Sequence, residues 1–350
     1  MLDCNQSISV IIPVINEEKF ILGAINVILE QFNFKRDFEI LISDGGSTDG
    51  TLEIINNFID NNPNIRLINN PQKIVSTGFN LALNQAKGDI IIRVDGHCEI
   101  PPDYLEKCSN LLKSYDADIV GGVIETISTG LIGKAISIAQ SSPFGLGGVK
   151  FRRMDLDEGS YVDTLAFGAH RRELFTDIGG YDEEMICNQD DEFNHRVIQA
   201  GKKIWMDPTI KTKYYARESF IKLFKQYFNY GFYKVRGIQK RGELVSIRHL
   251  IPSSFIIVLN ITLIFGFFLQ LPWIAFSVGF LYLIFNLSAS ILATSSIRVI
   301  PLISLAFWTL HLGYGLGFIW GLIRFINKWK DTELKDFNFN KEHFCSHNLK

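Results

Sequence analysis

The chain has 350 residues and a formal net charge of −2, which leaves room for one large domain with an additional region and gives no indication of nucleic-acid binding. Its mean hydropathy of +0.13 is high for a soluble protein, and the apolar residues are concentrated, since residues 251–294 contain no Asp, Glu, Lys or Arg. The five cysteines show no CxxC spacing and are expected to be free thiols in a reducing compartment.

Apolar runs alternate with helical patterns over the first hundred residues. Residues 8–14, 38–42, 65–68 and 90–94 are rich in Ile, Leu and Val, a composition typical of buried parallel strands. Helical patterns lie between these runs, beginning near Asn16, Ser47 and Ser76. This alternation predicts a doubly wound, mostly parallel α/β sheet.

Acidic side chains come directly after two of these strands. Asp44 ends the second strand and Asp95 follows the fourth, where Gly96 would let a ligand approach the backbone. Ligands of open α/β sheets bind at the carboxyl ends of the strands. Asp95 and His97 offer one oxygen and one nitrogen ligand, a pair that suits Mn²⁺ or, less well, Mg²⁺. On this stretch alone, a turn-capping Asp and a surface His are the alternative interpretation.

The loop after the first strand argues against two other kinds of nucleotide site. The glycine pattern GxGxxG of dinucleotide-binding domains is absent there. A nucleotidyltransferase would need a loop rich in Gly and Lys or Arg, whereas residues 13–17 read PVINE. Acids at the sheet edge suit a metal-chelated diphosphate, because bare carboxylates would repel a free one. A non-catalytic membrane scaffold remains an open alternative at this point.

Four motifs occur in order within residues 7–236: PVINEE, SDGGSTDGT, RVDGH and GGYDEEMICNQDDEFNHR. Together they resemble the motif set of family 2 glycosyltransferases with the GT-A fold. Within that family, they are most similar to the membrane-attached subgroup of succinoglycan-type glucosyltransferases of exopolysaccharide assembly. The resemblance implies an inverting transferase that takes a sugar from a nucleotide-sugar, with UDP-glucose as the first candidate. It also implies a polyprenyl-linked or polysaccharide acceptor.

The resemblance assigns roles to residues of the first three motifs. Asp44 matches the acid that holds the nucleotide. Asp95 matches the first acid of the metal-binding DxD motif, and His97 stands where the second acid is usual, so that the metal, Mn²⁺ or Mg²⁺, is left open. Three residues of the first loop are expected to help bind the donor: Pro13, Asn16 and Glu17.

The fourth motif supplies the candidate base. By register Asp190 matches the general base of the family, with Gln189 in place of the usual Glu, and Asp191 is the second candidate. A carboxylate is needed because the attacking sugar hydroxyl must lose its proton as it attacks. Taken alone, the same acidic run would also suit a helix N-terminus, where negative charge is favourable. A single displacement needs no enzyme nucleophile, and no Ser–His or Cys–His set stands out.

Residues 214–236 form an aromatic and basic amphipathic stretch. Such a helix fits a membrane interface near anionic lipid, and in the family a segment at this place also closes over the donor. An ordinary core-packing helix is the alternative. The candidates for acceptor contact or closure are Arg171, Gln226, Tyr230 and Arg236. For Arg171, a solvated helix start is the alternative.

Three apolar segments follow, at residues 251–271, 272–294 and 299–323, each about long enough to cross a bilayer at roughly 20 residues per crossing. Three crossings would place the tail outside, whereas basic residues after the last segment favour the cytoplasm. One segment is therefore a candidate for a re-entrant or interfacial position. The first residues lack a signal peptide's apolar run, so we expect a cytoplasmic catalytic domain on the inner membrane. The expected domains are residues 1–213, 214–248, 249–326 and 327–350.

Overall fold

The computed structural model describes residues 6–32, 37–243, 246–271 and 273–346, and the chain divides into two compact units. The first unit consists of residues 1–125, 154–214 and 333–350, and the second of residues 126–153 and 215–332. This division differs from the expected domains in two places. Residues 126–153 join the helical second unit, and the end of the chain returns to the first.

A parallel half-sheet forms the start of the first unit. Its strands lie in the order β3 (Ile65–Asn69), β2 (Phe38–Asp44), β1 (Ile8–Val14) and β4 (Ile90–Arg93). All pairings among them are parallel, so that their carboxyl ends meet at one edge. Buried β-branched and Leu side chains fill both faces, as expected of parallel strands covered by helices. The predicted doubly wound arrangement is confirmed.

The other half of the sheet is antiparallel. β8 (Ala169–Arg171) pairs with β4 and with β6 (Ile119–Ile127) in antiparallel register. β9 (Ile204–Tyr215) lies next to β6 and pairs with the short strands β5 (Cys98–Glu99) and β7 (Ser160–Tyr161). Within the described residues the sheet is thus mixed, with the parallel strands at one side.

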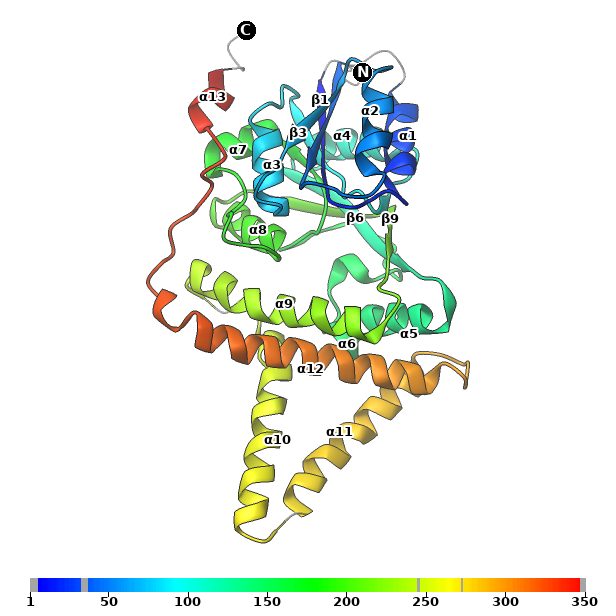
Figure 1. Cartoon of the computed structure of the whole chain (residues 1–350), viewed down its shortest axis with the longest axis vertical. Coiled ribbons are helices and arrows are strands. Elements are labelled where there is room, and N and C mark those ends of the chain that lie inside the picture. The colour runs from blue at the N-terminus through cyan, green and yellow to red at the C-terminus, as the bar shows by residue number, and fades with distance from the viewer. Residues whose placement is uncertain (1–5, 33–36, 244–245, 272, 347–350) are drawn as a thin grey trace. The chain divides into compact units, whose positions relative to one another are not determined.

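Helices cover both faces of the parallel strands. In Figure 1, α3 (Val75–Leu83) lies on one side of them and α1 (Ile21–Gln31) and α2 (Thr51–Ile59) lie on the other. α13 (Lys341–Ser346), near the end of the chain, packs against α7. The remaining helices of this unit are α4 (Tyr104–Ser114), α7 (Arg172–Ile178) and α8 (Gln189–Gln199).

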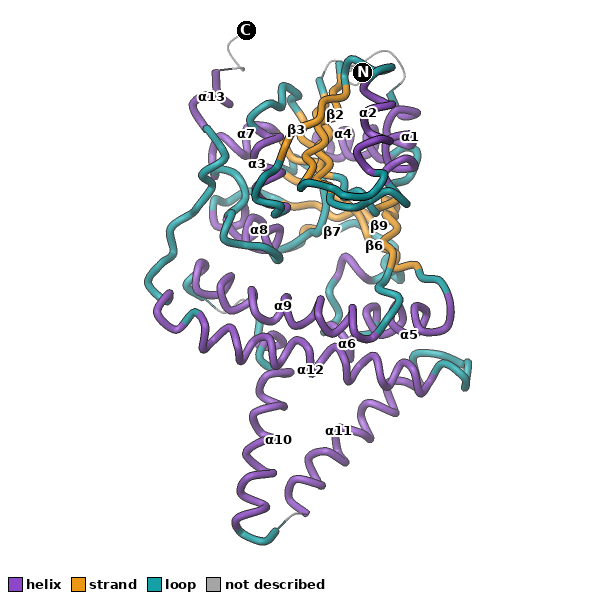
Figure 2. Tube along the Cα trace, in the orientation of Figure 1, coloured by secondary structure: helices purple, strands orange, loops and turns teal. Residues whose placement is uncertain are grey.

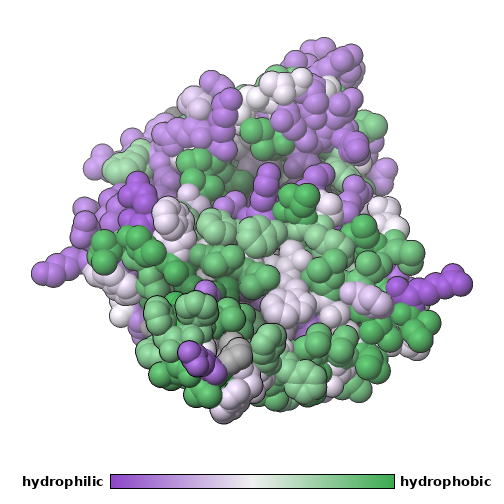
Figure 3. Space-filling view, turned by 60° about the horizontal axis from the view of Figure 1, so that its bottom comes forward, coloured by the Kyte–Doolittle hydropathy of each residue, from purple (hydrophilic) through white to green (hydrophobic). Residues whose placement is uncertain are grey.

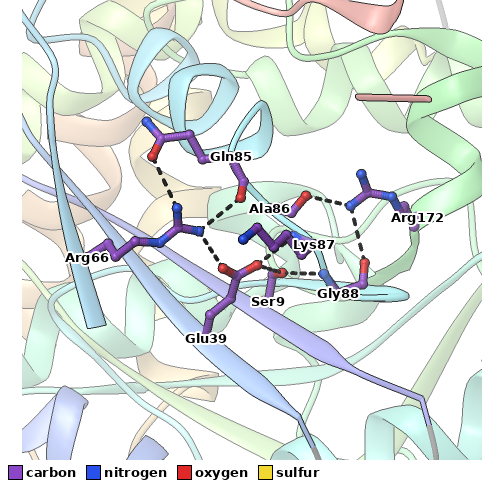
Figure 4. A network of polar contacts seen from close by, with 8 residues as sticks. All are labelled: Ser9, Glu39, Arg66, Gln85, Ala86, Lys87, Gly88 and Arg172. Carbon is purple, nitrogen blue, oxygen red and sulfur yellow. Dashed lines mark hydrogen bonds and ion pairs between the residues drawn. The ribbon is translucent and has the colours of Figure 1, made fainter. Parts of the chain in front are cut away.

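A polar network holds the amino-terminal ends of the parallel strands together, where β4 begins (Figure 4). The Glu39 carboxylate accepts hydrogen bonds from the Ser9 hydroxyl, at 2.6 Å, and from the Lys87 amide, at 2.6 Å, and pairs with Arg66. Arg172 donates to the carbonyl of Ala86 at 2.7 Å. These bonds hold the turn before β4. The carboxyl ends of the strands, where Asp44 lies, are at the other end of the sheet.

Helices build the second unit. α9 (Phe220–Arg241) and α12 (Ile300–Arg324) lie side by side, and α10 (Ile251–Phe268) and α11 (Trp273–Leu292) project from them as a hairpin (Figures 1 and 2). α10 and α12 are the described helices that are long and apolar enough to span a membrane, and α12 is half-buried. Large apolar side chains cover the surface of the hairpin (Figure 3). The shorter elements are α5 (Gly130–Ser141), α6 (Pro143–Leu146), η1 (Lys150–Arg152), η2 (Ile247–His249) and η3 (Ile326–Lys328).

Glycines let α9 and α12 approach closely. A Cβ added at Gly317 would lie 2.0 Å from the carbonyl oxygen of Phe228, and one at Gly321 would lie 2.6 Å from that of Phe232. Gly315 faces α10, where an added Cβ would meet Ile256 at 2.5 Å. These glycines therefore serve helix packing.

Candidate active site

The loop after β2 is closed by Asp44. This carboxylate is 5% exposed and accepts hydrogen bonds from the amide of Gly46, at 2.8 Å, and from the hydroxyl of Ser47, at 2.5 Å. Gly46 has a φ of +81°, a conformation that glycine adopts without strain. Asp44 thus fixes the shape of the Gly-rich turn at the carboxyl end of β2, where a nucleotide would bind.

The loop after β1 is bonded to this turn. The Asn16 amide donates to Ser47 Oγ at 2.9 Å, and Asn16 Oδ1 accepts from the Thr48 amide at 2.8 Å. Pro13 lies one residue before the end of β1, where it pairs in register with Ser43. The predicted donor residues of the first two motifs therefore lie together at one edge of the sheet.

Glu17 bonds to His97, a contact that the sequence did not reveal. Glu17 Oε1 lies 2.9 Å from His97 Nδ1. Gly96 makes room for this contact, because a Cβ there would lie 3.0 Å from Val14 Cγ1 and 3.1 Å from Glu17 Cγ. If Nδ1 carries the proton that Glu17 accepts, the lone pair of the neutral imidazole is on Nε2. A carboxylate that orients a histidine in this way is typical of metal ligands.

The donor set fits a divalent cation shared with a substrate. Asp95 supplies carboxylate oxygen and His97 supplies Nε2, ligands that Mn²⁺ accepts together. No group of three or more His, Cys, Asp or Glu side chains within the described residues is arranged to hold a metal. Two protein ligands suit a cation that also binds a diphosphate and water.

Arg93 is a site residue that sequence reasoning missed. It is 4% exposed, and its Nε and Nη2 donate to Asp95 Oδ1 at 3.0 and 2.9 Å. Its guanidinium lies 5.6 Å from the centre of the Tyr181 ring. Burial lowers the pKa of Arg93, but the charges of Asp95 and Asp190, with Tyr181, raise it above its ordinary value overall. The available signal was a lone Arg in the apolar run IIIRV, two residues before Asp95 and so on the same face.

Asp190 lies in the first turn of α8 and is partly buried. Its Oδ1 accepts a hydrogen bond from the Asp191 amide at 2.9 Å. Burial raises the pKa of Asp190 to about 6, with Arg93 acting to lower it and Asp191 acting to raise it. A carboxylate with a pKa near neutrality suits general-base catalysis. Arg93, which pairs with Asp95, lies 5.6 Å from the ring centre of Tyr181, a residue of the loop that leads to Asp190, so the metal acid and the base are treated as one candidate site.

Arg171 lies away from this site. It pairs in register with Ile90 at the start of β4, at the opposite end of that strand from Asp95. Its Nε and Nη2 donate to the carbonyls of Ala117, at 2.8 Å, and Leu112, at 2.7 Å. The cause is the antiparallel direction of β8, which the parallel pattern of the first strands did not indicate. Arg171 is therefore not brought together with Asp95, and its contact with an acceptor stays a prediction.

The other three closure candidates belong to the second unit. Arg236 is 1% exposed and pairs with Asp331 at 2.9 Å, and it donates to the Lys328 carbonyl at 3.3 Å. Gln226 Nε2 donates to Tyr230 Oη at 3.0 Å, one helical turn away. Arg236 thus fixes the chain after α12, while the roles of Gln226 and Tyr230 stay predictions.

Comparisons with known proteins identify relatives of the chain. The chain matches the glycosyl transferase family 2 model over residues 9–178. It is 32% identical over 247 residues to "Succinoglycan biosynthesis protein ExoA" of Rhizobium meliloti (strain 1021), covering 70% of this chain and 74% of that protein. It is 31% identical over 267 residues to a dolichyl N-acetyl-alpha-D-glucosaminyl phosphate 3-beta-D-2,3-diacetamido-2,3-dideoxy-beta-D-glucuronosyltransferase of Methanococcus voltae, covering 74% and 82%.

The solved structures include the same fold. The mannosyltransferase PcManGT from Pyrobaculum calidifontis, in complex with GDP-Man and Mn²⁺, superposes with a TM-score of 0.54. The sequence identity is 16%, and the match covers 93% of this chain and 88% of that one. The mixed sheet with its flanking helices is therefore the GT-A fold that the sequence predicted.

Proposed function

Because the chain belongs to glycosyltransferase family 2, we propose that it transfers a sugar from a nucleotide-sugar to an acceptor in cell-surface polysaccharide synthesis. Its likeness to a succinoglycan biosynthesis protein supports this pathway class. The proposed donor is a UDP-sugar, with UDP-glucose as the first candidate. The proposed acceptor is a polyprenyl-linked or growing polysaccharide chain.

Donor binding is assigned to the edge formed by the first two loops. Asp44 and Asn16, each bonded to the Ser47 region, shape a turn against which the nucleoside rests. Asp95 and His97 hold the diphosphate end, with Arg93 fixing the Asp95 carboxylate. A divalent cation bound there, Mn²⁺ in preference to Mg²⁺, would neutralise the diphosphate as it leaves.

Asp190 is assigned as the general base. It accepts the proton of an acceptor hydroxyl while that oxygen forms a bond to the anomeric carbon. The bond from the anomeric carbon to the diphosphate oxygen breaks, and its electron pair leaves with the nucleoside diphosphate. Attack from the face opposite the leaving group inverts the anomeric centre. The observation that supports this assignment is the buried Arg93, which is paired with Asp95 and lies 5.6 Å from the ring centre of Tyr181 in the loop before Asp190.

Membrane attachment is assigned to the hairpin of α10 and α11. Neither helix contains a charged residue, and most of their large apolar side chains are exposed. Their 18 and 20 residues correspond to about 27 and 30 Å at about 1.5 Å per residue, close to the thickness of a bilayer's hydrocarbon core. We assign α12 to the membrane surface, because it packs along α9, whose six basic and no acidic residues make it costly to bury in hydrocarbon.

The chain segments that make up the first unit support two membrane crossings rather than three. Residues before 126 and after 332 pack into the same unit, so both ends of the helical region must be on one side of the membrane. Two crossings by α10 and α11 satisfy this condition. The basic residues Arg324, Lys328 and Lys330 then lie in the cytoplasm, as the positive-inside rule favours.

The direct test uses the purified full-length chain in detergent with a panel of nucleotide-sugars and a lipid extract of membranes. We expect release of nucleoside diphosphate from one preferred donor, dependent on the extract and on a divalent cation. Release of pyrophosphate from a nucleoside triphosphate would instead identify a nucleotidyltransferase. Nucleotide binding without turnover of any donor would favour a scaffold.

A further inference from the structure

We propose that the C-terminal segment, residues 333–346, positions the base loop, residues 179–188, which leads into Asp190, and that contacts of Lys335, Asp336 and Asn338 do so. The proposal rests on the function proposed above. The base loop joins α7 to α8, and the C-terminal segment reaches it only after the chain has passed through all the helices of the second unit.

The Glu183 side chain is the main contact between the two. It is 8% exposed, and its Oε1 accepts from the Asn338 amide at 2.9 Å and from Asn80 Nδ2 at 2.8 Å. Its Oε2 accepts from Asn338 Nδ2 at 2.8 Å. Two of these three donors belong to the C-terminal segment. Without the segment, a buried carboxylate would lose most of its hydrogen bonds, which is costly.

The backbones of the two segments also meet. The Glu183 amide donates to the Lys335 carbonyl at 2.7 Å, and the Gly180 amide donates to Asp336 Oδ2 at 3.1 Å. A Cβ at Gly179 would lie 2.7 Å from Asp336 Oδ2, and Gly179 has a φ of +83°. The glycine pair of the GGYDEE motif thus allows the C-terminal segment to approach the base loop.

Core-like packing anchors the far end of the segment. Phe344 is fully buried, and the Arg172 guanidinium lies 3.7 Å from the centre of its ring. The same guanidinium donates to the Phe344 carbonyl at 2.9 Å. It also donates to the Ala86 carbonyl at 2.7 Å (Figure 4). The buried Arg172 guanidinium thus connects Phe344 to the turn before β4, which makes the C-terminal segment part of the first unit.

Asn80 connects Glu183 to the site. Besides Glu183, its side chain bonds both backbone groups of Tyr181: Oδ1 accepts from the Tyr181 amide at 2.9 Å and Nδ2 donates to the Tyr181 carbonyl at 2.8 Å. The Tyr181 ring contacts Arg93, which is paired with Asp95. Displacing the segment would therefore disturb Asn80, then Tyr181, and through Tyr181 the Arg93 guanidinium.

This arrangement makes the segment a positioning element that is synthesised after the helices of the second unit. A chain that lacks residues after 332 has the donor residues and Asp190, but it lacks the groups that hold the base loop. We infer that the site becomes competent only after the membrane helices have been made and the segment has docked. Activity would thereby be restricted to chains that carry their membrane region.

The test compares variants of the full chain in detergent. Asn338→Ala removes the Asn338 side-chain bond to Glu183, and Phe337→Ala, at a side chain that is 82% exposed, is the matched control. For Asn338→Ala we expect faster hydrogen exchange at Gly180 and Glu183. We also expect kcat to fall about 10- to 100-fold, as a small misplacement of catalytic groups would cause. UDP affinity and retention in carbonate-washed membranes should match the control.

A reciprocal exchange tests the contact itself. In the double variant Glu183→Gln with Asn338→Asp, the new amide can donate to the new carboxylate, so we expect kcat to recover relative to Asn338→Asp alone. Faster hydrogen exchange in Asn338→Ala with unchanged kcat would contradict the positioning role and leave the segment with a purely structural one. Unchanged exchange would contradict docking. If the parent chain turns over no donor, the proposed function fails, while the exchange data still decide whether the segment docks.

Discussion

At the scale of single residues, Asp190 makes the pH dependence of the reaction predictable. Burial raises the pKa of this carboxyl to about 6, and a general base acts only in its ionised form. We therefore expect kcat to be constant above about pH 7 and to fall as the pH decreases through about 6. The measurement is a pH profile of kcat for the full chain at saturating donor and acceptor. A flat profile between pH 5 and 8 would argue against Asp190 as the titrating base.

The contact between Glu17 and His97 leads to a prediction about the metal. If Glu17 orients the imidazole, Glu17→Ala should weaken Mn²⁺ binding in the presence of UDP by about 10- to 100-fold, the usual effect of losing such a partner. His97→Asp should keep activity and shift the preference towards Mg²⁺. Calorimetry of metal binding reports on both variants without an activity assay. Full activity in excess EDTA would contradict the metal assignment.

At the scale of helices and strands, the glycines of α12 give the clearest prediction. Gly317→Ala places a Cβ 2.0 Å from the Phe228 carbonyl, whereas Gly279 in α11 has no atom within 4 Å of an added Cβ. We expect Gly317→Ala to lower stability by about 1–3 kcal/mol through overpacking. Gly279→Ala should be neutral or mildly stabilising. Thermal unfolding in detergent compares the two variants, and equal melting temperatures would contradict close packing of α9 against α12.

The elements show which parts of the fold the sequence could predict. The strands that end at Asp44 and before Asp95 were predictable, because local composition and turn residues determine them. Arg93 was missed because one charged residue in an apolar run does not reveal its partners. The strand β8 was not predicted, because a three-residue strand has no periodicity to read. The sequence therefore predicted the acids at the sheet edge better than the groups that support them.

At the scale of the whole chain, the least predictable feature was the return of residues 333–346 to the first unit. The bond between Asn338 and Glu183 joins residues 155 positions apart, and neither residue lies in a sequence pattern that indicates the contact. Length and charge suggested only a polar tail. The contact matters for the proposed membrane topology as well, because residues on either side of the helical region belong to one unit.

Thiol labelling in intact cells tests that topology. Gln270→Cys lies at the end of the hairpin, and Phe337→Cys is exposed in the C-terminal segment. With two crossings, a membrane-impermeant reagent added outside should label Gln270→Cys and leave Phe337→Cys unlabelled until the cells are lysed. The parent chain serves as the control for its own cysteines. Labelling of Phe337→Cys from outside would instead indicate three crossings.

The central claim is that donor binding and proton removal are performed by different carboxylates of one site. The most direct measurement combines calorimetry of nucleotide-sugar binding with single-turnover rates for Asp190→Asn and Asp44→Asn in the full chain. Asp190→Asn should slow the chemical step by about two to four orders of magnitude with nearly unchanged donor affinity, whereas Asp44→Asn should mainly weaken binding. Normal turnover of Asp190→Asn together with an inactive Asp191→Asn would move the base by one residue. Normal turnover of both would contradict the mechanism.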